Sequence, residues 1–101
     1  MAQILELKTM SREVPKEISK MAKSHDLEVT MRVGKDGITG PLLSELIEQL
    51  KRRDLVKIKA NKGVSSNREH RKEIFSLIAE RTSSTIVFQR GNIAVFWRTN
   101  I

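Results

Sequence analysis

Apolar residues recur along the chain in two kinds of pattern, and each predicts one type of secondary structure. Spacings of three and four residues predict helices over residues 11–24, 39–53 and 66–81. Alternating residues, or short runs rich in β-branched and aromatic residues, predict strands over residues 27–33, 55–60, 84–89 and 93–98. The predicted order is therefore α-β-α-β-α-β-β, after a lead-in at residues 1–10 that shows no clear period.

Capping residues predict where these helices begin, and apolar stripes predict which face of each helix is buried. Ser11 is a candidate cap for the first helix, and Thr39 for the second, with Pro41 in its first turn. Ser66 and Glu69 have the spacing of a capping box for the third helix. The residues expected to face the core are, helix by helix, Ile18, Met21 and Ala22; Leu42, Leu43, Leu46, Ile47 and Leu50; and Ile74, Phe75, Leu77 and Ile78.

The strand patterns predict one mixed sheet. Right-handed crossovers in the two β-α-β units make the first three strands parallel, and a hairpin at Arg90-Gly91-Asn92 adds an antiparallel fourth strand. Clean alternation predicts that helices cover mainly one face of the sheet. In the first strand the expected buried side is Leu27, Val29, Met31 and Val33. The predicted fold class is α+β, a two-layer α/β sandwich with a four-stranded mixed sheet, and residues 1–101 are expected to form a single domain.

Composition narrows the chemistry that the chain can perform. There is no cysteine, and His25 and His70 alone do not complete a metal set, so we expect no metal and no other cofactor. No Ser, His or acidic residues stand at a usable catalytic spacing, which argues against an enzyme. No apolar run reaches the length of a membrane span, and the first ten residues do not resemble a signal peptide. We therefore expect a cytoplasmic, monomeric domain that does not contact a membrane.

The positive charge is concentrated in one segment. The chain carries a formal charge of +7, and residues 51–72 hold nine basic and two acidic side chains, against ten of each elsewhere. Clustering of this kind favours a polyanion partner, above all a nucleic acid. Lys57 and Lys59 are predicted to face the same way on one strand, and Arg68, Arg71 and Lys72 lie where a helix dipole disfavours cations. Lys51-Arg52-Arg53 ends a helix favourably and is a weaker candidate.

A short glycine motif, Gly34-Lys35-Asp36-Gly37, lies between the first strand and the second helix. Glycine permits positive φ and close approach of another backbone, and a turn of this kind at a helix start exposes amides that attract phosphate. In KH-type modules such a loop holds a nucleic-acid backbone. The alternative is a plain turn that needs two glycines, and the motif alone does not decide between them.

Several motifs together resemble one known family, the CRM domain (chloroplast RNA splicing and ribosome maturation), whose stand-alone members are called YhbY-like. The motifs are Gly34-Lys35-Asp36-Gly37-Ile38-Thr39, the spaced Leu42, Leu46 and Leu50, Asp54-Leu55-Val56-Lys57-Ile58-Lys59, Gln89-Arg90-Gly91-Asn92 and Val95-Phe96-Trp97-Arg98. The resemblance spans residues 11–98. The sequence departs from the family at Ser24-His25-Asp26-Leu27-Glu28, where members have a basic stretch with proline, and at Trp97, where they have tyrosine.

The resemblance implies a fold similar to the C-terminal domain of bacterial translation initiation factor three, and it implies RNA binding. Structured RNA is the expected partner, specifically ribosomal RNA in precursors of the large ribosomal subunit. The candidate RNA-binding residues are Gly34, Lys35, Asp36 and Gly37 in the loop, with Arg32, Lys57, Lys59, Arg68, Arg71 and Lys72 around it. Two alternatives stay open: a protein-interaction module with incidental charge, and RNA binding on the open sheet face through Phe88 and Phe96, in splicing or tRNA-related processes.

Overall fold

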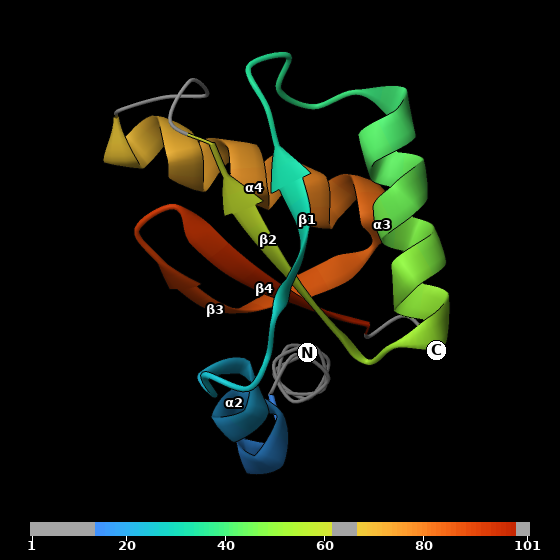
Figure 1. The fold of residues 1–101 in the computed structure, drawn as a ribbon, viewed down its shortest axis with the longest axis vertical. Helices are drawn as coiled ribbons and strands as arrows, with labels where there is room; N and C mark the ends of the chain where they lie inside the picture. Colours follow the sequence, from blue (N-terminus) through green and yellow to red (C-terminus); the bar gives the residue numbers. More distant parts are fainter. Residues whose placement is uncertain (1–13, 62–66, 99–101) are drawn as a thin grey trace, which may run out of the picture.

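Helices and strands follow one another in the predicted order (Figure 1). A computed structural model describes residues 14–61 and 67–98. The predicted lead-in at residues 1–10 and the cap at Ser11 lie outside these ranges. The described elements are α2 (Lys16–Ala22), β1 (Val29–Val33), α3 (Gly40–Arg52), β2 (Leu55–Ala60), α4 (Arg68–Thr82), β3 (Ser84–Arg90) and β4 (Ile93–Arg98).

The four strands form one mixed sheet in the order β1-β2-β4-β3. β1 runs parallel to β2, while β4 runs antiparallel to both β2 and β3, so that β3 is parallel to the first two strands. These directions and the α+β fold class confirm the prediction. The sequence did not predict that β4 enters between β2 and β3, where it becomes a central strand with three consecutive buried residues.

The main core lies between the sheet and the two long helices, α3 and α4. It is made of the residues Met31, Val33, Leu46, Leu50, Val56, Ile58, Ala60, Phe75, Ile78, Ala79, Ala94 and Phe96. Phe75 of α4 and Phe96 of β4 are both fully buried, and their rings meet edge to face with centroids 6.2 Å apart. Such a pair combines large apolar burial with a favourable ring geometry, so it anchors α4 on the sheet.

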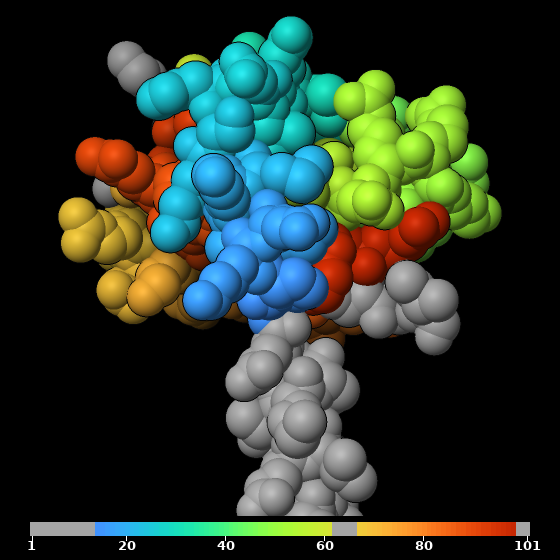
Figure 2. Space-filling view, turned by 90° about the horizontal axis from the view of Figure 1, so that it is seen from below, coloured from blue at the N-terminus to red at the C-terminus, as the bar shows by residue number. Residues whose placement is uncertain are grey.

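A smaller core lies on the opposite face of the sheet, under α2. Leu55 and Val95 point away from the main core and pack with Ala22, together with half-buried neighbours that include Trp97. Figure 2 shows α2 in blue, lying between the segment that follows it and the red end of β4. Helices therefore cover mainly one face, as predicted, but α2 also covers part of the other face near the start of β2.

The alternation predicted for residues 27–33 was wrong at its beginning. β1 begins at Val29, and its register with β2 shifts between Val29 and Met31. Leu27 consequently packs in the smaller core, whereas Met31 lies in the main core. A bulge of this kind adds one residue to a strand and turns its neighbours. β3, which like β1 is an edge strand, has a similar shift between Ile86 and Phe88.

Three residues predicted to face the core are instead exposed: Met21 by 51%, Ile47 by 39% and Leu77 by 41%. In α4 the buried residues follow the spacing i, i+3, i+4, i+7 from Phe75 to Thr82, and Leu77 falls outside that stripe. In α3 the polar Gln49 is buried, only 6% exposed, next to Leu50. The apolar spacing predicted only part of each buried helix face correctly, because some apolar residues lie at the edge of that face and are exposed.

The predicted caps had mixed outcomes. Thr39 caps α3 as expected, because its Oγ1 accepts a hydrogen bond from the backbone N–H of Leu42 at 3.2 Å. The cap of α4 is Asn67, whose Oδ1 accepts from the N–H of His70 at 3.1 Å, whereas Ser66, the predicted cap, lies outside the described residues. Asparagine is as good a cap as serine, so the sequence offered two adjacent candidates.

Candidate nucleic-acid interface

The glycine motif forms a tight turn that projects beyond the end of β1 (Figure 1). The N–H of Gly37 donates to the carbonyl of Gly34 at 2.9 Å, and Lys35 and Asp36 are exposed at the two central positions. A Cβ on either glycine would meet nothing within 4 Å, but Gly37 has a φ of +71°, which L-residues rarely adopt. Gly37 is therefore required by the turn itself, and Gly34 leaves an open approach to the backbone.

Backbone amides at this turn divide into used and unused groups. In the first turn of α3, Pro41 has no N–H, and the N–H groups of Leu42 and Leu43 donate to the side chain and carbonyl of Thr39. Within the described ranges, the amides of Lys35 and Asp36 make no hydrogen bond. An anion at this turn would thus meet the loop amides and the Lys35 ammonium.

Three basic residues lie in one row across the sheet beside this turn. Arg32 of β1 is the register partner of Lys59 of β2, Lys59 is opposite Ile93 of β4, and Ile93 is opposite Arg90 of β3. We call Arg32, Lys59 and Arg90 the basic row. Lys59 alternates with buried Ile58 and Ala60, so the row is on the face turned away from α3 and α4.

Electrostatically, the basic row is unbalanced. In the described part of the chain, none of its three residues forms an ion pair with an acidic side chain. Like charges on neighbouring strands repel one another, and among the described residues no ion pair offsets this repulsion. The row is therefore a surface that an anionic partner would stabilise.

The start of α4 continues this positive surface around the β3–β4 hairpin. Arg68 and Lys72, both exposed, line a cavity of about 290 Å³ together with Gln89, Arg90 and Gly91. Arg71 is half-buried and is less available than its two neighbours. The structure thus brings two of the three predicted α4 cations next to the basic row.

Lys57 is placed differently from Lys59, although both face the same side of β2. Its Nζ donates to the carbonyl of Leu27 at 3.1 Å, and the residue is half-buried. Lys57 therefore ties the segment that leads into β1 to the sheet. Its charge still contributes to the local potential, but its side chain has an internal partner.

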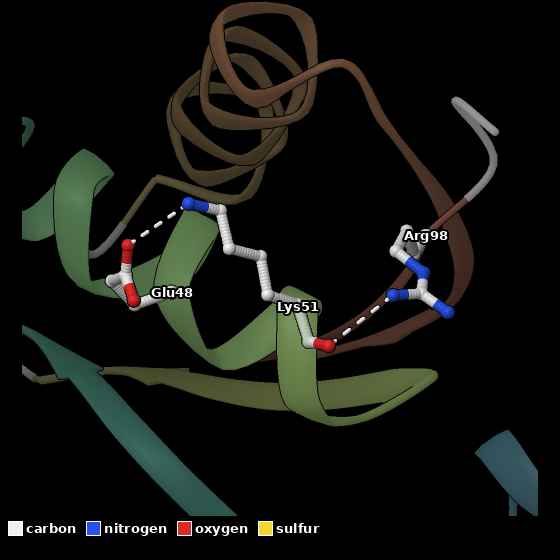
Figure 3. Close-up of polar contacts among 3 residues, drawn as sticks. All are labelled: Glu48, Lys51 and Arg98. Carbon is white, nitrogen blue, oxygen red and sulfur yellow. Dashed lines mark hydrogen bonds and ion pairs between the residues drawn. The ribbon is translucent and has the colours of Figure 1, made fainter.

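The Lys51-Arg52-Arg53 group lies at the other end of β2, away from the glycine turn (Figure 1). Figure 3 shows Lys51 beside Glu48, with the two charges 3.2 Å apart, and Arg98 donating to the carbonyl of Lys51 at 3.3 Å. Arg98 also lies 3.5 Å from Asp54. These contacts hold the end of α3 against the last strand, which gives Lys51 a structural role, whereas Arg52 and Arg53 are exposed.

Arg90 belongs to this surface although the sequence pattern alone does not indicate it. The sequence places Arg90 only in the hairpin turn, because Arg90-Gly91-Asn92 is a turn signal. Its place became clear only from the register of β3 with β4 and the central position of β4. The one feature of the sequence that could have indicated this role is the position of Arg90 directly before the turn, where it is the last residue of the strand.

The open-sheet alternative lost part of its basis. Phe96 is fully buried against α4 and is unable to stack on a base. Phe88 is half-buried against the smaller core.

Among the described residues, no three potential metal ligands form a cluster. None of the described helices has the length and hydropathy of a membrane span.

Comparisons with known proteins agree with this geometry. The sequence matches the model of the CRS1/YhbY (CRM) domain over residues 7–98, so the chain belongs to this family. Its fold is similar to the solution structure of the hypothetical protein SAV1595 from Staphylococcus aureus, a candidate RNA-binding protein, with a TM-score of 0.69 and 22% identity over 88% of this chain and 92% of that one. No curated protein matched. Membership of the family supports RNA binding as the general function.

Proposed function

We propose that this CRM-domain protein binds structured ribosomal RNA, in precursors of the large ribosomal subunit, and that it acts by binding rather than by catalysis. The glycine turn would hold phosphate oxygens through the amides of Lys35 and Asp36 and the Lys35 side chain. The basic row and the start of α4 would attract the neighbouring phosphates.

The observation that carries this proposal is the basic row. Its three cations lie in one row across the sheet, next to a turn with unused amides, and no acidic residue of the described ranges pairs with them. Folding alone gains nothing from this arrangement, because like charges repel. A phosphate backbone would convert the repulsion into attraction, and it would do so without reading sequence.

The test is fluorescence-anisotropy titration of a structured fragment of large-subunit ribosomal RNA across a salt series. The native chain is compared with Gly34→Asp, which adds a negative charge at a position with open space and no positive φ. Ser44→Asp adds the same charge on the exposed surface of α3 and is the matched control. Circular dichroism of all three proteins verifies that each is folded.

We expect steep salt dependence for the native chain, a loss of most affinity in Gly34→Asp, and little change in Ser44→Asp. Equal weakening by both variants would mean that the glycine turn does not contact the RNA. An unrelated structured RNA of equal length measures the ribosomal preference. Equal affinity for both RNAs would refute the ribosomal part of the proposal, and no binding to either would refute RNA binding.

A further inference from the structure

A cavity adjoins the phosphate-binding surface proposed above and shares Arg32 and the glycine turn with it. It has a volume of about 410 Å³ and lies between the turn, β1 and the beginning of α3, two elements that run next to each other (Figure 1). This volume is within the range of roughly 300–1,000 Å³ that is typical of small-ligand sites. Pro41 and Leu42 supply apolar lining, and Asp36 and Glu45 supply carboxylates.

Glu45 is held in place by buried polar groups. Its Oε2 accepts a hydrogen bond from Gln49 Nε2 at 3.0 Å. Gln49 is 6% exposed, and its Oε1 accepts from Thr30 Oγ1 at 2.6 Å. The bulge in β1 is what turns Thr30 toward α3, so that strand, helix and carboxylate are coupled. Because a carboxylate has about four acceptor positions, Glu45 keeps acceptor capacity for a ligand.

The chemistry of this cavity differs from that of the surface around it. Arg32 is the one basic residue among the described residues that line it, and two carboxylates would repel a phosphate there. Apolar walls together with an acceptor fit a nucleobase, which has flat faces and N–H donors at its edge. The cavity therefore complements the base of a nucleotide whose phosphate lies on the turn.

We propose that this cavity takes one unpaired guanine base, whose N1–H and N2–H donate side by side to the Glu45 carboxylate. Guanine alone of the four bases offers two adjacent donors on its Watson–Crick edge. Uracil offers one N–H donor between two carbonyl groups, and the carboxylate would repel the oxygens of both carbonyls. This inference rests on the proposed function, because the turn must first hold the RNA backbone.

The test uses RNA hairpins with one stem and one unpaired loop position, occupied by G, A, C, U or inosine. Inosine lacks the N2 amino group and so removes one of the two donors. Binding of the full chain is measured by anisotropy for the native protein, Glu45→Gln and Glu48→Gln. Glu45 and Glu48 are both exposed residues of α3, and only Glu45 lines the cavity, so the second variant is a matched control.

We expect the native chain and Glu48→Gln to bind the G hairpin about tenfold more tightly than the U or inosine hairpin. In Glu45→Gln the five hairpins should bind within about twofold of one another. The reason is that guanine can no longer donate two hydrogen bonds to a charged carboxylate. Affinity for the G hairpin should fall to the level of the other hairpins, whereas affinity for those others should not fall, because a negative charge has been removed.

Three outcomes would overturn the inference. Equal native affinity for all five hairpins would refute base selection while leaving the phosphate contacts of the proposed function intact. A guanine preference that survives in Glu45→Gln would show that another group reads the base. Failure of every hairpin to bind, with ribosomal fragments failing as well, would refute the proposed function and this inference together.

Discussion

The basic row makes a prediction in which stability and binding change in opposite directions. The perturbation is the triple substitution Arg32→Gln, Lys59→Gln and Arg90→Gln. Glutamine keeps much of each side chain and removes the charge. The matched control, Lys20→Gln, Arg52→Gln and Arg53→Gln, removes three exposed charges from α2 and from the far end of α3.

The expected magnitudes follow from the register. Arg32 and Lys59 lie on neighbouring strands, about 4.8 Å apart in the sheet, so their charges repel by about 0.7 kcal/mol in water at a separation of roughly 6 Å. Lys59 and Arg90 are separated by β4, roughly twice as far apart, and add about half as much. Removing all three charges should therefore raise the free energy of unfolding by about 1 kcal/mol at low salt.

RNA binding should respond in the opposite sense. Each lost phosphate contact costs about 1 kcal/mol, so the triple variant should bind about a hundredfold more weakly at low salt. The slope of the logarithm of affinity against the logarithm of salt concentration should become less steep by about 2. The control triple should keep a slope close to the native one.

The assays are urea denaturation followed by circular dichroism and anisotropy titration at four or more salt concentrations. Destabilisation of the row variant by more than about 1 kcal/mol would show that these residues hold the fold together, against the reasoning above. Equal loss of affinity in both triples would show that total charge matters and its position does not.

Three further predictions concern the fold and the turn. Phe75→Ala should lower the free energy of unfolding by about 3–5 kcal/mol in urea denaturation, since a fully buried ring is lost; a cost under about 1 kcal/mol would contradict the packing described. Thr39→Ala should cost about 1 kcal/mol by thermal melting, and Thr39→Ser should restore most of it, unless the cap contributes nothing. Gly37→Ala should cost about 1–2 kcal/mol and Gly34→Ala much less, because Gly37 alone of the two has positive φ; equal costs would argue against this turn geometry.

The order of elements was predictable from sequence because it depends on local periodicity. Runs such as 55–60, where buried and partly exposed residues alternate after Leu55, keep one face against the helices whatever the neighbours are. The order of the strands in the sheet was not predictable in this way, because it depends on which strand edge is free when the hairpin docks. Nothing in residues 93–98 alone indicates that β4 enters between β2 and β3.

The candidate site was predicted in part for the same reason. The turn at Gly34–Gly37 and the outward side of Lys59 follow from local sequence, and the structure places both as expected. The internal partner of Lys57 and the row position of Arg90 depend on segments far away in the chain. Single-strand patterns carry no information about such cross-strand neighbours.

The bulges in β1 and β3 have a consequence for how this molecule behaves at high concentration. The outermost strands of an open sheet expose unpaired N–H and C=O groups, which invite strands of other molecules to add and to start aggregates. Here both outermost strands carry a register shift, while β2 and β4 pair without one. Gln49 further occupies the Thr30 carbonyl of β1 from the side. An incoming strand would find only short matched stretches at either edge, so the sheet resists growth by strand addition.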